Sequence, residues 1–298
     1  MDISDRFRGC LLGLAVGDAV GTTVEFQARG TFTPVTDMVG GGPFQLQPGQ
    51  WTDDTSMALC LATSLVEKGE FDPVDQMNRY CDWYKNGYLS STGTCFDIGN
   101  TVRGALDQYK TTGDPFSGST HPRSAGNGCL MRLAPVPMFC YPDCDRTIHL
   151  SDESSRTTHG ASECIEASRL FGEILFRALS AANKTEILME HQSEQITSAA
   201  IQAIAKGTYQ SKTLRNIRGS GYVVESLEAA LWSFWTTETF EQAVLTATNL
   251  GDDADTTAAI CGQLAGAFYG VQGIPSHWLE LLTRKEEIST LADQLYAI

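Results

Sequence analysis

Apolar residues recur at helical spacing along most of the chain, and alternating patterns typical of strands are almost absent. A stripe formed by Phe7, Cys10, Leu11 and Leu14 is one example. Together the stripes predict roughly a dozen helices. They include residues 7–15, 55–68, 161–180, 193–206 and 277–298. The sequence therefore predicts an all-α fold, and we expect one compact domain over residues 1–298, arranged as an orthogonal helix bundle.

Glycine and proline divide these helical segments. The first stripe is expected to end in the segment Gly17-Asp18-Ala19-Val20-Gly21, where glycines around one acid suggest tight packing beside a site. Residues 29–50 have no clear period and are predicted to form a loop. Asp72-Pro73 is a typical helix start, because proline fits the first turn. Pro135 and Pro137 are expected to interrupt any helix there.

Two clusters of Asp and Thr precede apolar helical runs, one near residue 53 and one near residue 254. Asp53 and Asp54 would lie about 100° apart on a helix, so they cannot share a face and must be directed by the turn before it. If the two turns meet, their side chains form a nest of oxygen ligands. The set consists of Thr52, Asp53, Asp54, Asp253, Asp255 and Thr256.

An oxygen-only ligand set without nearby His or Cys suits Mg²⁺ or Mn²⁺ and argues against zinc. Carboxylates packed together raise one another's pKa unless cations neutralise them. Each cluster alone is better explained as a helix cap on a solvated surface. The presence of both favours a metal centre, and we expect a site for two metal ions where the helix N-termini converge.

The composition is that of an ordinary globular protein with a strong acidic excess. In 298 residues, 21 Lys and Arg stand against 36 Asp and Glu, giving a formal net charge of −15. Such a chain is a poor candidate for binding nucleic acid or an anionic membrane. No apolar run is expected to approach the ~18 residues of a membrane span, and the N-terminus lacks signal-peptide features. The nine scattered cysteines indicate reduced thiols, as in a cytoplasmic protein.

Two further segments are candidates for a functional site. Glu25 lies between apolar residues, and an unpaired carboxylate in that position is either exposed or functional. The segment Gly126-Asn127-Gly128 is suited to positive φ values and to an anion nest formed by backbone amides. On residue types alone, an ordinary turn explains it better.

The motifs described so far resemble those of the ADP-ribosylglycohydrolase family, from Arg8 to about Gly270. Five or more motifs occur in the family's order. Thr52-Asp53-Asp54-Thr55-Ser56-Met57 and Gly251-Asp252-Asp253-Ala254-Asp255-Thr256 resemble its two metal-binding motifs. The opening motif implies that Glu25 is at the catalytic centre, with Asp54 as a second acid–base candidate. The loop Thr94-Cys95-Phe96-Asp97-Ile98-Gly99 resembles that of the arginine-directed branch, in which the aspartate contacts substrate; the serine-directed branch lacks this loop.

The same resemblance implies the remaining substrate contacts. The segment Gly126 to Met131, with Asn127, Gly128 and Cys129, would cradle a pyrophosphate. Gly99 would contact substrate beside Asp97. His159 would contact a ribose or a phosphate, and Tyr222 would stack on the adenine.

We therefore expect a magnesium-dependent hydrolase that removes ADP-ribose from arginine of an ADP-ribosylated protein substrate. Two alternatives stay open. The same ligands would serve a metal-dependent phosphohydrolase that attacks the pyrophosphate. A third possibility is a protein that binds ADP-ribose or neutralises a toxin by occluding a transferase. Ser/His/Asp chemistry is not expected, because no Gly-x-Ser-x-Gly motif occurs.

Overall fold

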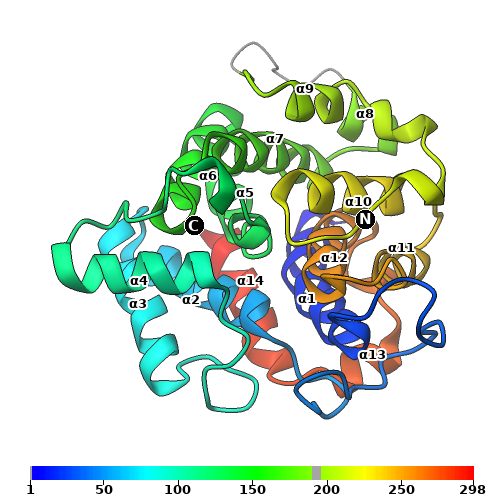
Figure 1. The fold of residues 1–298 in the computed structure, drawn as a ribbon, viewed down its shortest axis with the longest axis horizontal. Coiled ribbons are helices and arrows are strands. Elements are labelled where there is room, and N and C mark those ends of the chain that lie inside the picture. The colour runs from blue at the N-terminus through cyan, green and yellow to red at the C-terminus, as the bar shows by residue number, and fades with distance from the viewer. Residues whose placement is uncertain (1, 190–195) are drawn as a thin grey trace.

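The computed structural model describes residues 2–189 and 196–298, and its regular structure is helical (Figure 1). No strand occurs in these residues, which contain only isolated β-bridges. The all-α prediction is confirmed. In chain order the described helices are α1 (Ile3–Gly21), α2 (Asp53–Lys68), α3 (Pro73–Asn86), α4 (Asn100–Thr112), α5 (Pro135–Cys140), α6 (Cys144–Thr158), α7 (Ser162–Ala178), α8 (Lys184–Leu188), α9 (Ala199–Ala205), α10 (Val223–Trp235), α11 (Phe240–Thr248), α12 (Ala254–Tyr269), α13 (Ser276–Leu281) and α14 (Lys285–Ala297).

Helices α1 and α12 lie side by side at the centre of the fold, although they come from opposite ends of the chain (Figure 1). Glycines at every fourth position of α1 allow this contact. A Cβ atom on Gly13 would lie 2.3 Å from the carbonyl oxygen of Gly262, and one on Gly17 would lie 2.1 Å from that of Ala258. The two backbones therefore touch, and no larger residue fits between them.

The segment Gly17–Gly21 forms the last residues of α1, which ends at Gly21, so the helix end expected in this segment is confirmed. Glycine inside a helix costs about 1 kcal/mol relative to alanine. Here the backbone contact with α12 offsets that cost. The expected tight packing is confirmed, since a Cβ on Gly21 would lie 2.4 Å from the Cα of Asp255.

Several other helix ends follow from local sequence. The Asp72 carboxylate accepts hydrogen bonds from the backbone N–H groups of Val74 and Asp75 at 3.0 and 2.9 Å, and so caps α3. Helix α2 ends at Gly69, whose φ is +66°. The expected interruption at Pro135 is wrong, because α5 begins there. Both prolines lie in its first turn, where no intrahelical N–H donor is required.

The other helices pack around the α1–α12 pair. Helices α10 and α11 pack on α12, and α14 packs against α1, α2 and α5 (Figure 1). Buried apolar residues from Phe7 to Leu295 form one continuous cluster. The helix expected over 193–206 is observed as α9, and residues 193–195 of that range lie outside the described residues.

One described stretch, Ile3–Val24, is long and apolar enough to cross a membrane by length and composition alone. The sequence interpretation did not anticipate it. However, 89% of the window that meets these criteria is buried within the protein, as is typical of a core helix.

Replacement of Gly13 by alanine should destabilise the fold. The added methyl group would meet backbone atoms of α12, and overpacking of this kind costs about 1–3 kcal/mol. Gly104→Ala is the matched control, because Gly104 lies inside α4 with no atom near its would-be Cβ. This control should gain roughly 0.4–1 kcal/mol. Urea denaturation measures both, and equal stability of the Gly13 variant and wild type would contradict the role of this contact.

Candidate active site

The two acidic helix starts meet in the fold. Helix α2 begins at Asp53 after Thr52, and α12 begins at Ala254 after Asp253. The hydroxyl of Thr52 donates to Asp255 Oδ2 at 3.3 Å, across 203 positions of sequence. In return, the hydroxyl of Thr256 donates to Asp54 Oδ1 at 3.2 Å. Each cluster thus contributes a threonine that binds an aspartate of the other.

Asp18 of α1 fixes the start of α2. Its Oδ1 accepts from the backbone N–H and hydroxyl of Thr52 at 2.9 and 3.0 Å. Its Oδ2 accepts from the corresponding groups of Thr55 at 3.0 and 2.6 Å. Because Thr52 makes no cap with its own side chain, Asp18 serves as the N-cap from another helix. Sequence reasoning did not include Asp18 in the site; its position among helix-packing glycines was the available signal.

Three carboxylate oxygens in the centre of the site are buried and lack hydrogen-bond partners within the described residues: Glu25 Oε2, Asp54 Oδ2 and Asp255 Oδ1. Burial, together with the charge of Asp97, raises the pKa of Glu25 to about 9. Burial and neighbouring acids likewise raise the pKa of Asp97 to about 7. The pKa values of Asp53, Asp54 and Asp255 are raised well above the usual range for the same reasons.

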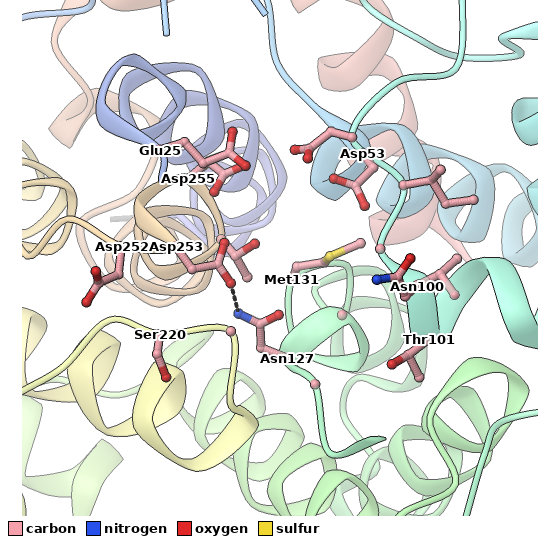
Figure 2. A pocket seen from close by; sticks show the side chains of 18 of the residues that line it. Glu25, Asp53, Asn100, Thr101, Asn127, Met131, Ser220, Asp252, Asp253 and Asp255 are labelled. Atoms are coloured by element: carbon pink, nitrogen blue, oxygen red, sulfur yellow. Dashed lines mark hydrogen bonds between the residues drawn. The ribbon is translucent and has the colours of Figure 1, made fainter. Parts of the chain in front are cut away.

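This cluster can hold a metal ion. Oxygens of Glu25, Asp97 and Asp255 lie within 4.8 Å of one another, as do oxygens of Asp18, Asp54 and Asp255. Asp18 acts as an anchor rather than a ligand, since both of its oxygens already accept two hydrogen bonds. Buried carboxylate oxygens without donors are suited to a hard cation. Asp255 belongs to both groups, and Figure 2 shows its side chain beside that of Glu25.

The cluster forms one end of a cavity of about 850 Å³. Twelve of the predicted site residues line it. They are Glu25, Asp53, Asp97, Gly99, Gly126, Asn127, Gly128, Met131, His159 and Asp253, and Asp255 and Thr256 complete the set. Four others do not line it: Thr52 and Asp54 lie fully buried beneath the acidic cluster, and Cys129 and Tyr222 are discussed below.

The loop that carries Asp97 is fixed by its own polar residues. Ser90 Oγ donates to the carbonyl oxygen of Thr94 at 2.6 Å, and Ser91 Oγ donates to that of Trp51 at 2.5 Å. The second bond joins the loop to the residue before Thr52. Asp97 has a φ of +60°, which is uncommon for a residue other than glycine. It is held in this conformation while its carboxylate lies beside Glu25 and Asp255.

The segment around Gly126 and Gly128 lines the cavity, but its expected positive φ values are wrong. Neither glycine is among the positive-φ residues, and Gly126 has a φ of −80°. Glycine is needed here for space, since a Cβ on Gly128 would lie 2.8 Å from the His159 ring. The backbone N–H groups of Gly128 and Cys129 have no acceptor within the described residues. They are therefore free to bind an anion.

Two buried residues, Arg132 and His159, pack against the segment around Gly126 and Gly128. The Arg132 guanidinium donates to the Gly128 carbonyl oxygen at 2.6 Å and to Thr158 Oγ1 at 2.7 Å. His159 Nδ1 lies 2.8 Å from the same threonine hydroxyl. Burial and the charge of Arg132 lower the pKa of His159 to about 3, so the imidazole is neutral at physiological pH. Arg132 was not predicted as a site residue, although it directly follows Met131, the last residue of the segment expected to cradle a pyrophosphate.

The remaining predicted contacts divide into two kinds. Asn127 Nδ2 donates to Asp253 Oδ2 at 2.7 Å, which joins the anion segment to the acidic cluster (Figure 2). Cys129 is buried beneath the segment, and its thiol contacts the Gly126 carbonyl oxygen. Tyr222 is 38% exposed, follows the lining residue Gly221, and donates its hydroxyl to Glu163 at 2.6 Å.

The cavity is also lined by residues that were not predicted from the sequence, including Phe26, Asn100, Thr101, Arg218, Ser220 and Asp252.

Comparison with known proteins identifies the family of this site. The sequence profile of the ADP-ribosylglycohydrolase family matches residues 1–298. The chain belongs to the ADP-ribosylglycohydrolase family. It is 46% identical over 292 residues to "ADP-ribosylarginine hydrolase Tri1" of Serratia proteamaculans, an alignment covering 98% of this chain and 79% of that protein.

Other relatives of the ADP-ribosylglycohydrolase family match over equal lengths. The chain is 33% identical over 310 residues to "ADP-ribosyl-[dinitrogen reductase] glycohydrolase" of Rhodospirillum rubrum, covering 99% of this chain and 97% of that one. A solved structure titled "ADP-ribosylglycohydrolase-related protein complex" superposes with a TM-score of 0.88 at 43% identity. That match covers 99% of this chain and 98% of that chain.

Divalent cations should stabilise the fold more strongly as pH rises. Without a cation, the folded site keeps protons on Glu25 and Asp97 that the unfolded chain has already released. The protonated forms of Glu25 and Asp97 contribute to stability in full below the pKa of about 4 that these side chains have in the unfolded chain. This contribution is lost as pH rises through about 7 to 9, the pKa values of the folded protein. A cation replaces these protons. The Mg²⁺-induced rise in Tm should therefore be larger at pH 8 than at pH 5.5, as measured by differential scanning fluorimetry. No rise at either pH would argue against a cation site.

Proposed function

We propose that the protein hydrolyses the N-glycosidic bond between ADP-ribose and a modified arginine of a protein substrate, with two Mg²⁺ ions bound (Mn²⁺ being the alternative). The observation that carries this proposal is the group of three buried carboxylate oxygens, on Glu25, Asp54 and Asp255, that have no hydrogen-bond partner among the described residues. Glu25 and Asp255 line one end of a cavity of about 850 Å³, with Asp54 buried beneath them, and this volume is suited to a ligand of nucleotide-sugar size. The name of the 46% identical relative, an ADP-ribosylarginine hydrolase, supports the same substrate.

The metal ligands would be Asp53, Asp54, Asp253 and Asp255, with the hydroxyl oxygens of Thr52 and Thr256. Both hydroxyls already donate to carboxylates of the cluster, and their lone pairs remain available. When bound, Mg²⁺ would neutralise the carboxylates, hold ribose hydroxyls and polarise a water. Asp18 would set the ligand geometry through its four hydrogen bonds to the start of α2.

In the reaction, the water oxygen bonds to C1 of the ribose while the bond from C1 to the guanidine nitrogen breaks. The electron pair of that bond stays on the nitrogen, and one proton from the water finishes on the guanidine. Carboxylates beside C1 stabilise the oxocarbenium-like centre of such a transition state and carry the proton. Glu25 and Asp54 are the acid–base candidates, because each has a buried oxygen free of other donors.

The rest of the cavity would bind the non-reacting part of the substrate. The free N–H groups of Gly128 and Cys129 would hold the pyrophosphate, and Met131 would pack beside it. Neutral His159 would contact the phosphate or a ribose. Tyr222, exposed beside Gly221, would stack on the adenine at the far end. We place this activity in the cytoplasm, in keeping with nine free cysteines.

Incubation with mono-ADP-ribosylated arginine and serine peptides, with and without chelator, tests the proposal. We expect free ADP-ribose from the arginine peptide, loss of activity in excess EDTA and recovery with Mg²⁺. Release of AMP would instead indicate a phosphohydrolase. Preference for the serine peptide would overturn the choice of linkage, and full activity in EDTA would overturn the role of the metal.

Asp97→Asn should lower turnover of ADP-ribosyl-arginine by at least about tenfold, or ~1.4 kcal/mol in the barrier. A carboxylate pairs with a planar guanidinium through two hydrogen bonds, and the amide loses both the charge and one acceptor. Asp107→Asn is the matched control. It makes the same change on the exposed face of α4, where the aspartate pairs only with Lys110 at 3.6 Å. Steady-state kinetics decides, and full activity of the Asp97 variant would sink its assigned role.

A further inference from the structure

A second hollow of about 500 Å³ adjoins the main cavity and shares Asp97 and Ile98 with it, but none of the other acidic residues. Its other lining residues are Phe44, Tyr84, Cys95, Phe96 and Arg103. The nucleotide sugar proposed above accounts for the main cavity and leaves this hollow unassigned. Because Asp97 and Ile98 line both spaces, the hollow adjoins the part of the main cavity that contains the acidic cluster.

Three phenylalanines connect the two spaces, and we call Phe26, Phe44 and Phe96 the aromatic wall. The ring centroids of Phe26 and Phe44 are 6.5 Å apart, and those of Phe44 and Phe96 are 5.1 Å apart. Phe26 lines the main cavity, whereas Phe44 and Phe96 line the second hollow. The rings come from two different loops, so the wall is formed only in the folded protein.

The backbone holds the wall in place. Phe44 lies in a turn closed by a 3.2 Å bond from the N–H of Gln45 to the carbonyl of Gly42, and two bonds between Gly41 and Leu46 brace it. The turn rests on the segment before Glu25, since Thr23 Oγ1 donates to the Gly40 carbonyl oxygen at 3.1 Å.

Phe26 is exposed despite its fixed backbone. Its φ is +62°, an unfavourable value for a bulky residue, and its N–H donates to the Asp252 carbonyl at 2.7 Å. It nevertheless leaves 68% of its surface exposed. A large apolar ring held at the mouth of a polar cavity, at a cost in backbone strain, indicates a binding role.

We propose that the second hollow and the aromatic wall bind the polypeptide part of the substrate. The guanidinium of the modified arginine lies against Asp97, its methylene stem lies along Phe44 and Phe96, and the neighbouring residue of the target protein enters the hollow. This inference rests on the proposed function. Charge supports it: Asp97 attracts the cationic end, while the aromatic rings suit an alkyl stem and stack with a guanidinium.

The experiment compares two substrates that share ADP-ribosyl-arginine, namely the modified free amino acid and a modified peptide. Phe44→Ala should lower kcat/KM for the peptide at least about fivefold more than for the free amino acid, mainly through KM. Tyr296→Ala is the matched control. Tyr296 is an aromatic residue, 48% exposed, whose ring contacts that of Phe7 near the other end of α1, and its replacement should leave both rates unchanged.

The outcomes separate the two proposals. If wild type cleaves neither substrate, the proposed function fails. If wild type cleaves both and Phe44→Ala lowers the two rates equally, the peptide-binding role fails while the function stands. The remaining case is that the hollow holds the adenine of the substrate, and calorimetric titration of ADP-ribose tests it. An affinity loss in the Phe44 variant as large as its loss on the peptide would show that the hollow holds the adenine, and would overturn the inference.

Discussion

The contact between the backbones of α1 and α12 is the constraint on which the site depends. At Gly13 and Gly17, α1 lies so close to α12 that carbonyl oxygens of α12 occupy the space where a side chain would be. Asp18 follows Gly17 directly and holds the start of α2, while α12 itself carries Asp255. Three segments distant in sequence are thereby aligned through one rigid pair. A small separation of these helices would move the anchor of one acidic cluster relative to the other.

This alignment has an electrostatic cost that the protein only partly compensates. The positive ends of the α2 and α12 dipoles face the carboxylates, and threonine hydroxyls cross between the clusters. Helix dipoles contribute about 0.3–1 kcal/mol per charge, too little to offset the burial of several carboxylates. Hence the pKa values of Glu25, Asp54 and Asp255 are raised. The same arrangement is therefore suited to holding cations, and the uncompensated burial of its carboxylates lowers the stability of the fold.

Much of the fold and of the site could be predicted from the sequence, for identifiable reasons. Helical periodicity indicates an all-α protein directly, and two Asp/Thr clusters at helix starts predict their own convergence. Asp18 could not be found this way, because its role depends on which helix lies beside α1. The positive φ expected at Gly128 was wrong for a similar reason: the His159 ring that excludes a side chain is distant in sequence. Local sequence patterns predict turns and helix caps, whereas contacts between segments that are distant in sequence can be identified only from the tertiary structure.

The two sides of Asp97 differ in how they recognise a substrate. Towards the acidic cluster, the site consists of buried carboxylates and free N–H groups, which select charge and hydroxyl geometry. Towards the second hollow, it consists mainly of aromatic rings held by tight turns, which select shape and tolerate varied side chains. An enzyme that removes one modification from proteins benefits from this division. Under the proposed function, strict recognition of the ADP-ribose end would fix the reaction and permissive aromatic contacts would admit the surrounding polypeptide, with Asp97 between the two.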